Sequence, residues 1–336
     1  MNYFLLTLGC QMNMSDGERV ETVLQCMGYT PVDNEEDADL IGILACSVRQ
    51  KAIDKVYSRI HKWNKWKNQK NLVTFISGCI LPSDKEKFLK LFDIIFQMSE
   101  LPQLPDIIQQ YGVVNHSSLM ASQSLNKVNN NLSFFWDVKP SYKSNFEAFV
   151  PIQNGCDKFC SFCAVPFTRG REISRPSEDI LNEVKSLVEK GYKSITLLGQ
   201  NVNSYGLDKN GNELTFAQLL EKIGHFGIES NKQFWVYFTS PHPRDMKNDV
   251  IDTIAKYPHL AKQIHLPMQS GDDKVLIKMN RNHTMERYDE IVRYIRITIP
   301  EATLFTDIIV GFTDESDEEF EHTQLAMEQY NFNMAY

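Results

Sequence analysis

The stretch Gly155-Cys156-Asp157-Lys158-Phe159-Cys160-Ser161-Phe162-Cys163 places three cysteines in a C-x3-C-x2-C spacing, with no fourth cysteine nearby. This spacing allows one tight loop to offer three thiolates to one face of a cubane iron–sulfur cluster. Four cysteines close such a cluster, as in electron carriers. Three leave one iron open, and an open site is what a metal needs to hold a reactant. The spacing therefore predicts a cluster that does chemistry on a bound molecule.

Three other uses of these cysteines explain the pattern less well. A structural zinc site prefers paired C-x2-C hooks that supply four ligands, and the second hook is absent. A disulfide scaffold fits poorly, because seven cysteines in 336 residues is an odd and small number. A redox C-x2-C pair would use Cys160 and Cys163 but would give Cys156 no role.

Length and composition are those of an ordinary globular protein. A chain of 336 residues, 42% apolar and 23% charged, is long enough for two domains with proper cores. The longest apolar runs are far shorter than the roughly 20 residues that a membrane span requires. The N-terminus, Met1–Leu6, lacks the basic region and cleavage site of a signal peptide. We expect a cytoplasmic protein without membrane contact, in a reducing compartment where thiols serve metals.

Charge is unevenly distributed along the chain. The net charge of −8 argues against a uniformly basic nucleic-acid binder. Residues 49–70 nevertheless carry eight Lys or Arg and one acid, interleaved with Tyr57, Trp63 and Trp66. A basic helix with aromatic residues can follow phosphates and stack a base, which makes Arg49 and Lys62 candidates for RNA contact. The same pattern equally fits a solvated helix face with the tryptophans packed inward.

Strand and helix patterns alternate along the first hundred residues. This alternation predicts a small α/β domain with a parallel sheet over residues 1–114. A Ser15 and Glu18 capping-box pattern predicts where its first helix begins. The expected strands are Tyr3–Leu8, Leu40–Leu44 and Leu72–Ile76, and the expected helices are Ser15–Met27 and about 49–67.

Each of these three strands runs directly into a cysteine: Cys10, Cys46 and Cys79. Ligands of open α/β sheets bind beyond the carboxyl ends of the strands, so the three cysteines are expected to converge at one edge. Glycines 9 and 78 allow the backbone to approach closely whatever the cysteines hold. The arrangement predicts a second cluster with an open iron. The remaining cysteine, Cys26, falls within a helical pattern and is expected in the core.

Residues 115–145 are rich in Ser, Asn and Lys and are expected to form an interdomain linker, with a short strand at Phe134–Asp137. After the linker the alternation of strand and helix resumes over residues 146–336. Repeated βα units of this length predict a partial (β/α) barrel, whose active site gathers at the C-terminal ends of the strands. The expected strands are 149–152, 194–198, 234–238, 264–267 and 303–310.

The cluster loop resembles that of radical S-adenosylmethionine (SAM) enzymes. The continuation Pro166-Phe167-Thr168-Arg169-Gly170-Arg171-Glu172-Ile173-Ser174-Arg175-Pro176 resembles the methylthiotransferase branch of that superfamily, as do residues 198–206, 240–243 and 265–271. Within the branch, Gly9-Cys10-Gln11-Met12-Asn13 together with Cys46-Ser47-Val48-Arg49 is most similar to the MiaB-type tRNA methylthiotransferases. The resemblance runs in consistent order from Tyr3 to Tyr336.

This resemblance implies an activity and its cofactors. MiaB-type enzymes attach a methylthio group to C2 of N6-isopentenyladenosine, beside the anticodon of tRNA. It implies two [4Fe-4S] clusters: one on Cys156, Cys160 and Cys163 that binds SAM through its open iron, and one that carries the sulfur, on Cys10, Cys46 and Cys79. The implied partners are tRNA and an external one-electron donor, and the protein is expected to be a monomer.

The resemblance also suggests further contacts. Arg169, Arg171 and Arg175 are candidates for contact with RNA phosphates or with the cofactor carboxylate. The residues expected to lie against SAM are Gly199, Gln200, Asn201, Ser240, His242, Val310 and Gly311. The polar candidates also have structural interpretations: a loop-capping amide, a histidine with its hydrogen bonds satisfied, or a surface arginine.

Two short segments depart from the family pattern. The family usually has Asn-Thr before its second N-terminal cysteine, where this chain has Leu44-Ala45. After Gly311-Phe312 it usually has Pro-Gly-Glu-Thr, where this chain has Thr313-Asp314-Glu315-Ser316. Neither departure removes a cluster ligand, although the second is expected to alter a turn near the cofactor.

Length and substrate leave alternatives open. The family continues beyond Tyr336, completes its barrel and adds an RNA-binding β-barrel, so a fragment or a truncated gene product is expected. The same chemistry also serves threonylcarbamoyladenosine in tRNA or an aspartate of a ribosomal protein. Outside catalysis, the chain could be an inactive iron–sulfur or RNA-binding module, or a zinc protein.

Overall fold

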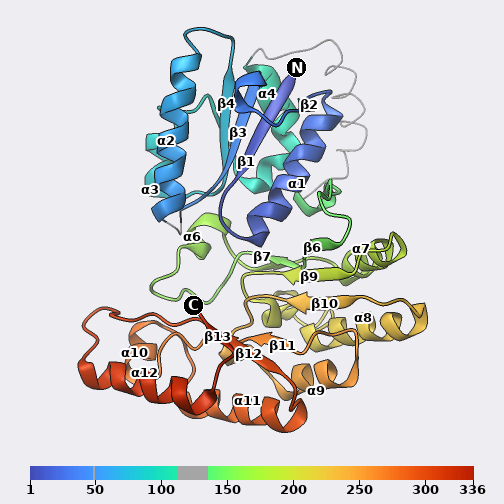
Figure 1. Cartoon of the computed structure of the whole chain (residues 1–336), viewed down its shortest axis with the longest axis vertical. Helices are drawn as coiled ribbons and strands as arrows, with labels where there is room; N and C mark the ends of the chain where they lie inside the picture. The colour runs from blue at the N-terminus through green and yellow to red at the C-terminus, as the bar shows by residue number, and fades with distance from the viewer. Residues whose placement is uncertain (48–49, 112–134) are drawn as a thin grey trace. The chain divides into compact units, whose positions relative to one another are not determined.

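A computed structural model describes residues 1–47, 50–111 and 135–336 of the chain (Figure 1). These residues divide into two compact units, Met1–Lys143 and Ser144–Tyr336. Arg49 and most of the expected linker over 115–145 lie outside the described residues. None of the described helices combines the length and the apolar character needed to cross a membrane.

The first unit is built on a five-stranded parallel sheet with the order β2-β1-β3-β4-β5. All seven residues of its central strand, β3, are buried. Such a continuous apolar run is typical of a parallel strand covered on both faces. The strands are β1 (Asn2–Thr7), β2 (Thr30–Pro31), β3 (Leu40–Cys46), β4 (Val73–Cys79) and β5 (Ile94–Ile95); the helices are α1 (Gln11–Cys26), α2 (Gln50–Trp66), α3 (Pro82–Phe88) and α4 (Leu104–Gln110), with short 3-10 turns η1 (Glu35–Asp37), η2 (Met98–Gln103) and η3 (Phe135–Asp137).

Helices cover both faces of this sheet, with α1 and α4 on one face and α2 and α3 on the other (Figure 1). On the first face, Val20 and Leu24 of α1 pack with Leu44 of β3. On the second face, Ile60 of α2 packs with Ile41 of β3. The alternation of β3 side chains between the two cores confirms the predicted α/β domain with a parallel sheet.

The start of α1 and the burial of its last cysteine differ from expectation. The helix begins at Gln11, with Cys10 as its N-cap, and not at Ser15. Ser15 lies inside the helix, fully buried, where its hydroxyl accepts a hydrogen bond from Arg19 Nη1 at 2.6 Å. Cys26 is exposed and does not belong to the core.

The segment that leads out of the first unit is also different. Residues 135–137 form the 3-10 turn η3 and not the expected strand. Phe135 and Trp136 are buried in the core under α1, with their rings 5.1 Å apart. The packing of these two rings in the core stabilises the turn. A short apolar run in the sequence does not show whether its residues pair as a strand or pack in this way.

The second unit is a partial (β/α) barrel, as predicted. Its parallel strands pair in chain order, β6 with β9, β9 with β10, β11 with β12 and β12 with β13. A parallel bridge between Val236 and Leu260 connects β10 to the segment before β11. The parallel strands are β6 (Glu147–Pro151), β9 (Ser194–Leu198), β10 (Trp235–Phe238), β11 (Gln263–His265), β12 (Thr303–Thr306) and β13 (Met334–Ala335).

Helices connect successive strands of the barrel and cover one side of it (Figure 1). The carboxyl ends of the strands therefore share one edge, from which the loops after β6, β9, β10 and β12 emerge. A short antiparallel pair, β7 (Gln153–Asn154) with β8 (Ile173–Ser174), brackets the cluster loop. The helices are α6 (Val165–Arg169), α7 (Ser177–Glu189), α8 (Phe216–Ser230), α9 (Asn248–Lys256), α10 (Asp273–Lys278), α11 (Met285–Thr298) and α12 (Asp317–Tyr330), with 3-10 turns η4 (Val202–Ser204), η5 (Leu207–Lys209) and η6 (Pro243–Asp245).

Candidate functional site

The cluster loop of the second unit, residues 155–163, follows β7 and folds back on itself. Gly155 has a φ of +80°, and a Cβ at this position would lie 2.1 Å from the Arg171 carbonyl oxygen, so the loop requires glycine here. The Cys156 N–H donates to the Gly170 carbonyl at 3.2 Å, and the Cys163 N–H donates to the Cys160 carbonyl at 2.9 Å. The three cysteines therefore belong to one compact turn held against the segment before β8.

The three thiols of this loop influence one another. Burial raises the pKa of the Cys156 thiol to about 11, and nearby Glu172, Cys160 and Cys163 add to the increase. Burial and Cys160 likewise raise the pKa of Cys163. A metal centre binds cysteine as thiolate and supplies the positive charge that such a crowded, buried set lacks.

Beside the loop, a chain of buried hydrogen bonds ends in unpartnered oxygen atoms. Gln153 Nε2 donates to Ser204 Oγ at 3.0 Å, and Ser204 Oγ donates to Glu172 Oε1 at 2.6 Å. Gln153 Oε1 and Glu172 Oε2 are buried and have no partner among the described residues. Burial raises the pKa of the Glu172 carboxyl to about 7. Buried oxygen atoms without a partner in the protein are able to accept hydrogen bonds from a bound molecule.

A second chain of contacts starts on the cluster loop itself. Lys158 Nζ forms a buried ion pair with Asp245 Oδ2 at 2.6 Å, and Asn201 Nδ2 donates to the same oxygen at 2.8 Å. Asn201 Oδ1 and His242 Nε2 are buried without a partner in the described part of the chain. The loops after β6, β9 and β10 thus meet in one group of polar side chains, Gln153, Lys158, Glu172, Asn201, Ser204, His242 and Asp245. We call this group the polar chamber.

Of the residues predicted to contact SAM after β9 and β10, Asn201 and His242 belong to this chamber. Gly199 lies against it, because a Cβ at this position would lie 2.9 Å from Gln153 Oε1. Gln200 has a buried Oε1 without a partner among described residues. His242 is held by its backbone, because Asn203 both donates to its carbonyl and accepts from its N–H. Ser240 is exposed, with a φ of +58°.

Val310 and Gly311, the other two predicted contacts, follow β12 and lie in the open. The Val310 side chain is 62% exposed, and a Cβ on Gly311 would meet no atom within 4 Å. The Gly311 N–H donates to the carboxylate of Glu315. Among the described residues, no hydrogen bond or ion pair connects either of them to the polar chamber.

In the first unit, the ends of β1, β3 and β4, which lead to the three predicted cysteines, lie side by side in the sheet. Cys46 and Cys79 are direct partners in the register of β3 and β4, and the Ser47 N–H donates to the Cys79 carbonyl at 2.8 Å. A Cβ on Gly9, next to Cys10, would lie 2.8 Å from the Cys46 Cβ. Gly9 has a φ of +109°. Only glycine allows the end of β1 to pass this close to Cys46.

Asn13 connects the ends of all three strands. Its fully buried side chain donates from Nδ2 to the Leu8 carbonyl at 2.7 Å and to the Ala45 carbonyl at 2.8 Å. The Cys79 thiol lies 3.6 Å from Asn13 Oδ1 and donates to it. Cys10 is the N-cap of α1 and lies at the positive end of this 16-residue helix.

The arginines predicted to bind RNA near the cluster loop differ in exposure. The Arg171 side chain is 73% exposed, pairs with Asp157 and lies over the Phe159 ring at 5.5 Å. Arg169 Nη1 donates to the Asn154 amide oxygen at 3.2 Å. Arg175 is buried and pairs with Glu183, so its charge is used inside the protein.

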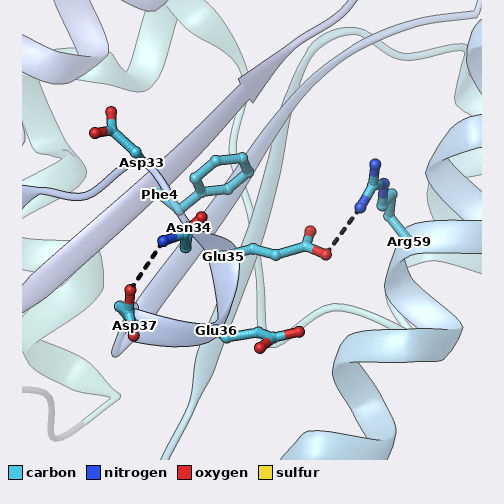
Figure 2. Close-up of a pocket in the computed structure, with 7 residues that line it drawn as sticks. All are labelled: Phe4, Asp33, Asn34, Glu35, Glu36, Asp37 and Arg59. Carbon is cyan, nitrogen blue, oxygen red and sulfur yellow. Dashed lines mark hydrogen bonds and ion pairs between the residues drawn. The ribbon is translucent and has the colours of Figure 1, made fainter.

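Lys62, the described RNA candidate of α2, helps to hold an acidic loop. This loop, residues 33–37, lines a hollow of about 460 Å³ together with Phe4 and Arg59. Figure 2 shows these residues and the pairing of Arg59 with Glu35. Lys62 and Arg59 pair with Glu35 at 2.6 and 2.8 Å, and Trp63 Nε1 donates to the same carboxylate. Although burial alone would raise the pKa of Glu35, these contacts lower it. The buried Trp63 supports the interpretation of α2 as a solvated helix with its tryptophan packed inward.

Several residues around the two cysteine sets could not be assigned a role from the sequence alone. They are Asn13, Lys158, Gln153, Glu172, Ser204 and Asp245 of the chamber, and Arg281, whose Nη1 lies 3.4 Å from Cys160 Sγ. A usable signal was present for Gln153, because a polar amide directly after the apolar strand Phe149–Ile152 is unusual. For the others the contacts span 32 to 121 residues, and no local pattern reports them.

Family models match both units. The Radical SAM superfamily model matches residues 150–326, and the model of "Uncharacterized protein family UPF0004" matches residues 2–97. The protein named tRNA-2-methylthio-N(6)-dimethylallyladenosine synthase from Carboxydothermus hydrogenoformans is 39% identical over 342 residues, covering 100% of this chain and 75% of its own length. The protein of the same name from Clostridium botulinum is 39% identical over 343 residues, covering 99% and 73%.

The chain belongs to this family of radical SAM enzymes. Solved structures agree in fold. TsrM from Kitasatospora setae, a radical SAM methyltransferase, matches with a TM-score of 0.65 at 12% identity over 99% of this chain and 72% of its own. OxsB, a cobalamin-dependent radical SAM enzyme, matches with the same TM-score and identity over 97% of this chain and 52% of its own. Membership of the superfamily implies one [4Fe-4S] cluster and SAM.

The residues present fit that cluster and cofactor. Three mutually interacting thiols on a compact turn suit three irons of a cluster, and the adjacent chamber offers unpartnered oxygen atoms. Within the described ranges, no three His, Cys, Asp or Glu side chains are grouped so as to hold a single metal ion. Thiolates around one zinc ion crowd together, whereas those of a cluster bind separate irons.

Proposed function

We propose that the chain is a tRNA methylthiotransferase that adds a methylthio group to C2 of N6-isopentenyladenosine, the 2-methylthio-N6-dimethylallyladenosine synthase reaction. The proposal is supported by 39% identity along the whole chain to proteins of that name. The single observation that carries it is a second set of three cysteines at a strand edge of the first unit, apart from the set in the radical SAM loop. A second set of cysteines supports an enzyme that must deliver sulfur as well as break a C–H bond.

In the second unit, Cys156, Cys160 and Cys163 would hold the cluster, and the polar chamber would hold SAM. When bound, the cluster and SAM together supply the radical chemistry that breaks an unactivated C–H bond. The oxygen atoms of Gln153, Glu172 and Asn201 can accept hydrogen bonds from the amino group and ribose hydroxyls of SAM. These side chains orient the cofactor, because each is already fixed by a buried contact on its other side.

In the first unit, we propose that Cys10, Cys46 and Cys79 hold a second [4Fe-4S] cluster that carries the transferred sulfur. Three ligands leave one iron free for that sulfur. Gly9 brings the end of β1 against Cys46, and Asn13 holds the strand ends in register. The N-terminus of α1 places backbone N–H groups beside Cys10, which favours a negatively charged centre.

For the RNA, we propose a contact surface at the cluster loop, made of Phe159, Phe167 and Arg171. The Phe167 side chain is 64% exposed, and its ring meets the Phe159 ring edge-on at 6.3 Å. Exposed aromatic rings beside an arginine stack nucleobases and neutralise phosphates. Arg169 is a further candidate for this surface, whereas the buried Arg175 is not. We also propose an external one-electron donor, a monomeric protein, and the reducing cytoplasm, where cysteine thiols stay available to metals.

The test combines a metal count with analysis of tRNA. After anaerobic reconstitution, we expect roughly eight irons per chain, with roughly four lost in Cys10→Ala and a different four in Cys160→Ala. Cys26→Ala is the matched control, because this exposed cysteine belongs to neither set and should leave the count unchanged. About four irons in the unaltered chain would exclude the second cluster.

The substrate is tested in a strain that lacks the corresponding gene. Expression of the chain should restore 2-methylthio-N6-isopentenyladenosine in the tRNA, measured by mass spectrometry of nucleosides, and Cys79→Ala should not. Restoration of a methylthio derivative of threonylcarbamoyladenosine instead would move the substrate to the alternative nucleoside. No change in any tRNA nucleoside, with eight irons bound, would contradict the proposed function of this chain.

A further inference from the structure

The turn at the end of α10 is hydrogen-bonded to the cluster loop, although the two segments are far apart in the sequence. The Ser161 N–H donates to the Met279 carbonyl at 3.0 Å, and the Ser161 hydroxyl donates to the Lys278 carbonyl at 2.8 Å. Asn280 Nδ2 donates to the Phe159 carbonyl at 2.9 Å. We call residues 278–281 the clasp. It fixes the loop between its second and third cysteines.

Arg281, the last residue of the clasp, is aimed at a cluster ligand. Its Nη1 donates to Cys160 Sγ at 3.4 Å, and its Nη2 donates to the Pro267 carbonyl at 3.1 Å. Its N–H is bonded to the Leu276 carbonyl at 3.0 Å, after Asn280 with a φ of +55°. This left-handed residue ends the helix and turns Arg281 back toward the loop.

The guanidinium of Arg281 is buried without a carboxylate partner. The residue is only 6% exposed, and no ion pair between it and an Asp or Glu exists in the described part of the chain. Its Nε also has no partner there. A buried positive charge is costly unless a negative group compensates for it. The group that Arg281 faces is the Cys160 sulfur, which becomes a thiolate when it binds iron.

The lowered pKa values of two nearby histidines agree with a fixed positive charge on Arg281. Burial and then Arg281 lower the pKa of His283 to about 4. Burial, followed by Arg281 and His283, also lowers the pKa of His242. Both imidazoles are therefore neutral near pH 7, and Arg281 supplies the fixed positive charge on this side of the loop.

We propose that Arg281 is a positioning residue for the radical SAM cluster, whose charge-assisted hydrogen bond to Cys160 makes the bound cluster easier to reduce. The inference rests on the proposed function only in that Cys156, Cys160 and Cys163 bind the cluster. A cluster held by three thiolates becomes more negative by one charge on reduction. A fixed positive charge at the sulfur therefore stabilises the reduced state more than the oxidised state, and hydrogen bonds to cluster sulfurs are known to set potentials in this way.

The test is an anaerobic redox titration followed by electron paramagnetic resonance, without SAM or tRNA. The chain carries Cys10→Ala, Cys46→Ala and Cys79→Ala, so that only the cluster of the second unit is observed. Arg281→Met should reduce the equilibrium constant for one-electron reduction at least tenfold, which is 59 mV to lower potential. Arg281→Lys, which keeps the charge, should change it less than threefold.

Asn280→Ala is the matched control, because it weakens the clasp without changing any charge. We expect normal iron content and less than a twofold change in the equilibrium constant. A change in Arg281→Met no larger than that in Asn280→Ala would overturn the proposal, since the clasp would then act only through loop geometry. If Arg281→Met binds less than half of the iron, Arg281→Gln and Arg281→Lys are compared instead, and equal potentials in these two would overturn it.

This experiment separates the inference from the proposed function. The titration measures only the cluster of the second unit, so its result holds whichever RNA or protein the enzyme modifies. Failure of the proposed function would appear as unchanged tRNA nucleosides with a normal potential in the unaltered chain. Failure of the inference would appear as an unchanged potential in Arg281→Met with tRNA modification by the unaltered chain intact.

Discussion

Asn13→Ala offers a direct test of how the first cysteine set is built. The amide nitrogen of Asn13 donates both of its hydrogens, to the Leu8 and Ala45 carbonyls, and its oxygen accepts from the Cys79 thiol. Alanine removes all three contacts at a fully buried position. The ends of β1, β3 and β4 then lose a side chain that connects all three.

The size of the effect follows from the two carbonyls. Each is left in the protein interior without the amide that it bonded, and a buried polar group without its partner costs about 1–3 kcal/mol. Together with the void left by the amide, we expect a loss of about 3–4 kcal/mol from the free energy of unfolding of the first unit. Since a domain has only about 5–15 kcal/mol in total, the unit should remain folded but be clearly weakened.

Urea unfolding of the metal-free protein, followed by tryptophan fluorescence, measures this loss. Three of the four tryptophans, Trp63, Trp66 and Trp136, lie in the first unit, so the signal reports mainly on it. Met14→Ala is the matched control, because Met14 lies on the same helix and is 52% exposed. It should change stability by less than about 0.5 kcal/mol.

Iron content gives a second readout of the same variant. In the absence of urea, at a temperature where Asn13→Ala is folded, we expect the variant to lose roughly four of eight irons. The reason is that the strand ends that carry the cysteines are no longer held in position. Unfolding free energies of Asn13→Ala and Met14→Ala that agree within about 0.5 kcal/mol would refute the reasoning about the strand ends. Full iron with reduced stability would show that Asn13 supports the sheet but not the cluster.

Three further predictions concern packing, charge and pH. Gly42→Ala would bring a methyl group within 2.0 Å of the Phe75 ring, and we expect a loss of about 1–3 kcal/mol or more in urea unfolding; wild-type stability would contradict the rigidity of this contact. Lys158→Met or Asp245→Asn should each cost about 3–5 kcal/mol in thermal unfolding, because a buried partner is left behind, and the double variant should cost less than the sum; additive losses would exclude coupling. The raised pKa of Glu172, about 7 in the folded state against 4.5, means that the folded metal-free protein binds a proton that the unfolded chain releases. The stabilisation that protonated Glu172 gives to the folded state is therefore complete below pH 4.5. It is lost as pH rises toward 7, which lowers the free energy of unfolding by up to about 3 kcal/mol. Glu172→Gln should flatten the dependence of Tm on pH, and parallel curves for the two proteins would contradict this.

The strands could be predicted because they obey the simplest rule of sequence reading. Buried parallel strands appear as short apolar runs, and the expected run Leu40–Leu44 differs from β3 only by two residues at its end. The cysteines could be placed because the carboxyl ends of parallel strands share one edge. That rule needs no knowledge of side-chain contacts, and it brought Cys46 and Cys79 together correctly.

The start of α1 could not be predicted, for a physical reason. Asn13, Ser15, Asp16 and Arg19 are polar and fully buried, so the face that packs against the sheet does not read as apolar. A search for apolar spacing therefore finds the helix only where Val20 begins it, and a capping pattern at Ser15 supplies a plausible but wrong start. The buried polar residues of α1, of which Asn13 contacts Cys79, therefore prevent the start of this helix from being recognised by apolar spacing.

The two departures from the family pattern show which parts of these sites depend on side chains. Where the family has Asn-Thr, Ala45 contributes only its carbonyl, which accepts from Asn13, and Leu44 is buried in the core. Any residue that fits the strand supplies that carbonyl, so the first cysteine set does not need the family residues at these positions.

The second departure replaces one turn by another with its own contacts. Glu315 accepts from the Gly311 N–H, and Ser316 caps α12 in a reciprocal pair with Glu319. The segment after β12 is therefore anchored at both ends, by the Glu315 carboxylate at Gly311 and by the Ser316 cap at α12. Gln153, Glu172 and Asn201 are held by contacts within the loops after β6, β9 and β10, and the turn after β12 takes no part in those contacts. Differences from the family at backbone-contact positions should thus be tolerated, whereas loss of Asn13 or Arg281, which contact a cysteine sulfur directly, should not.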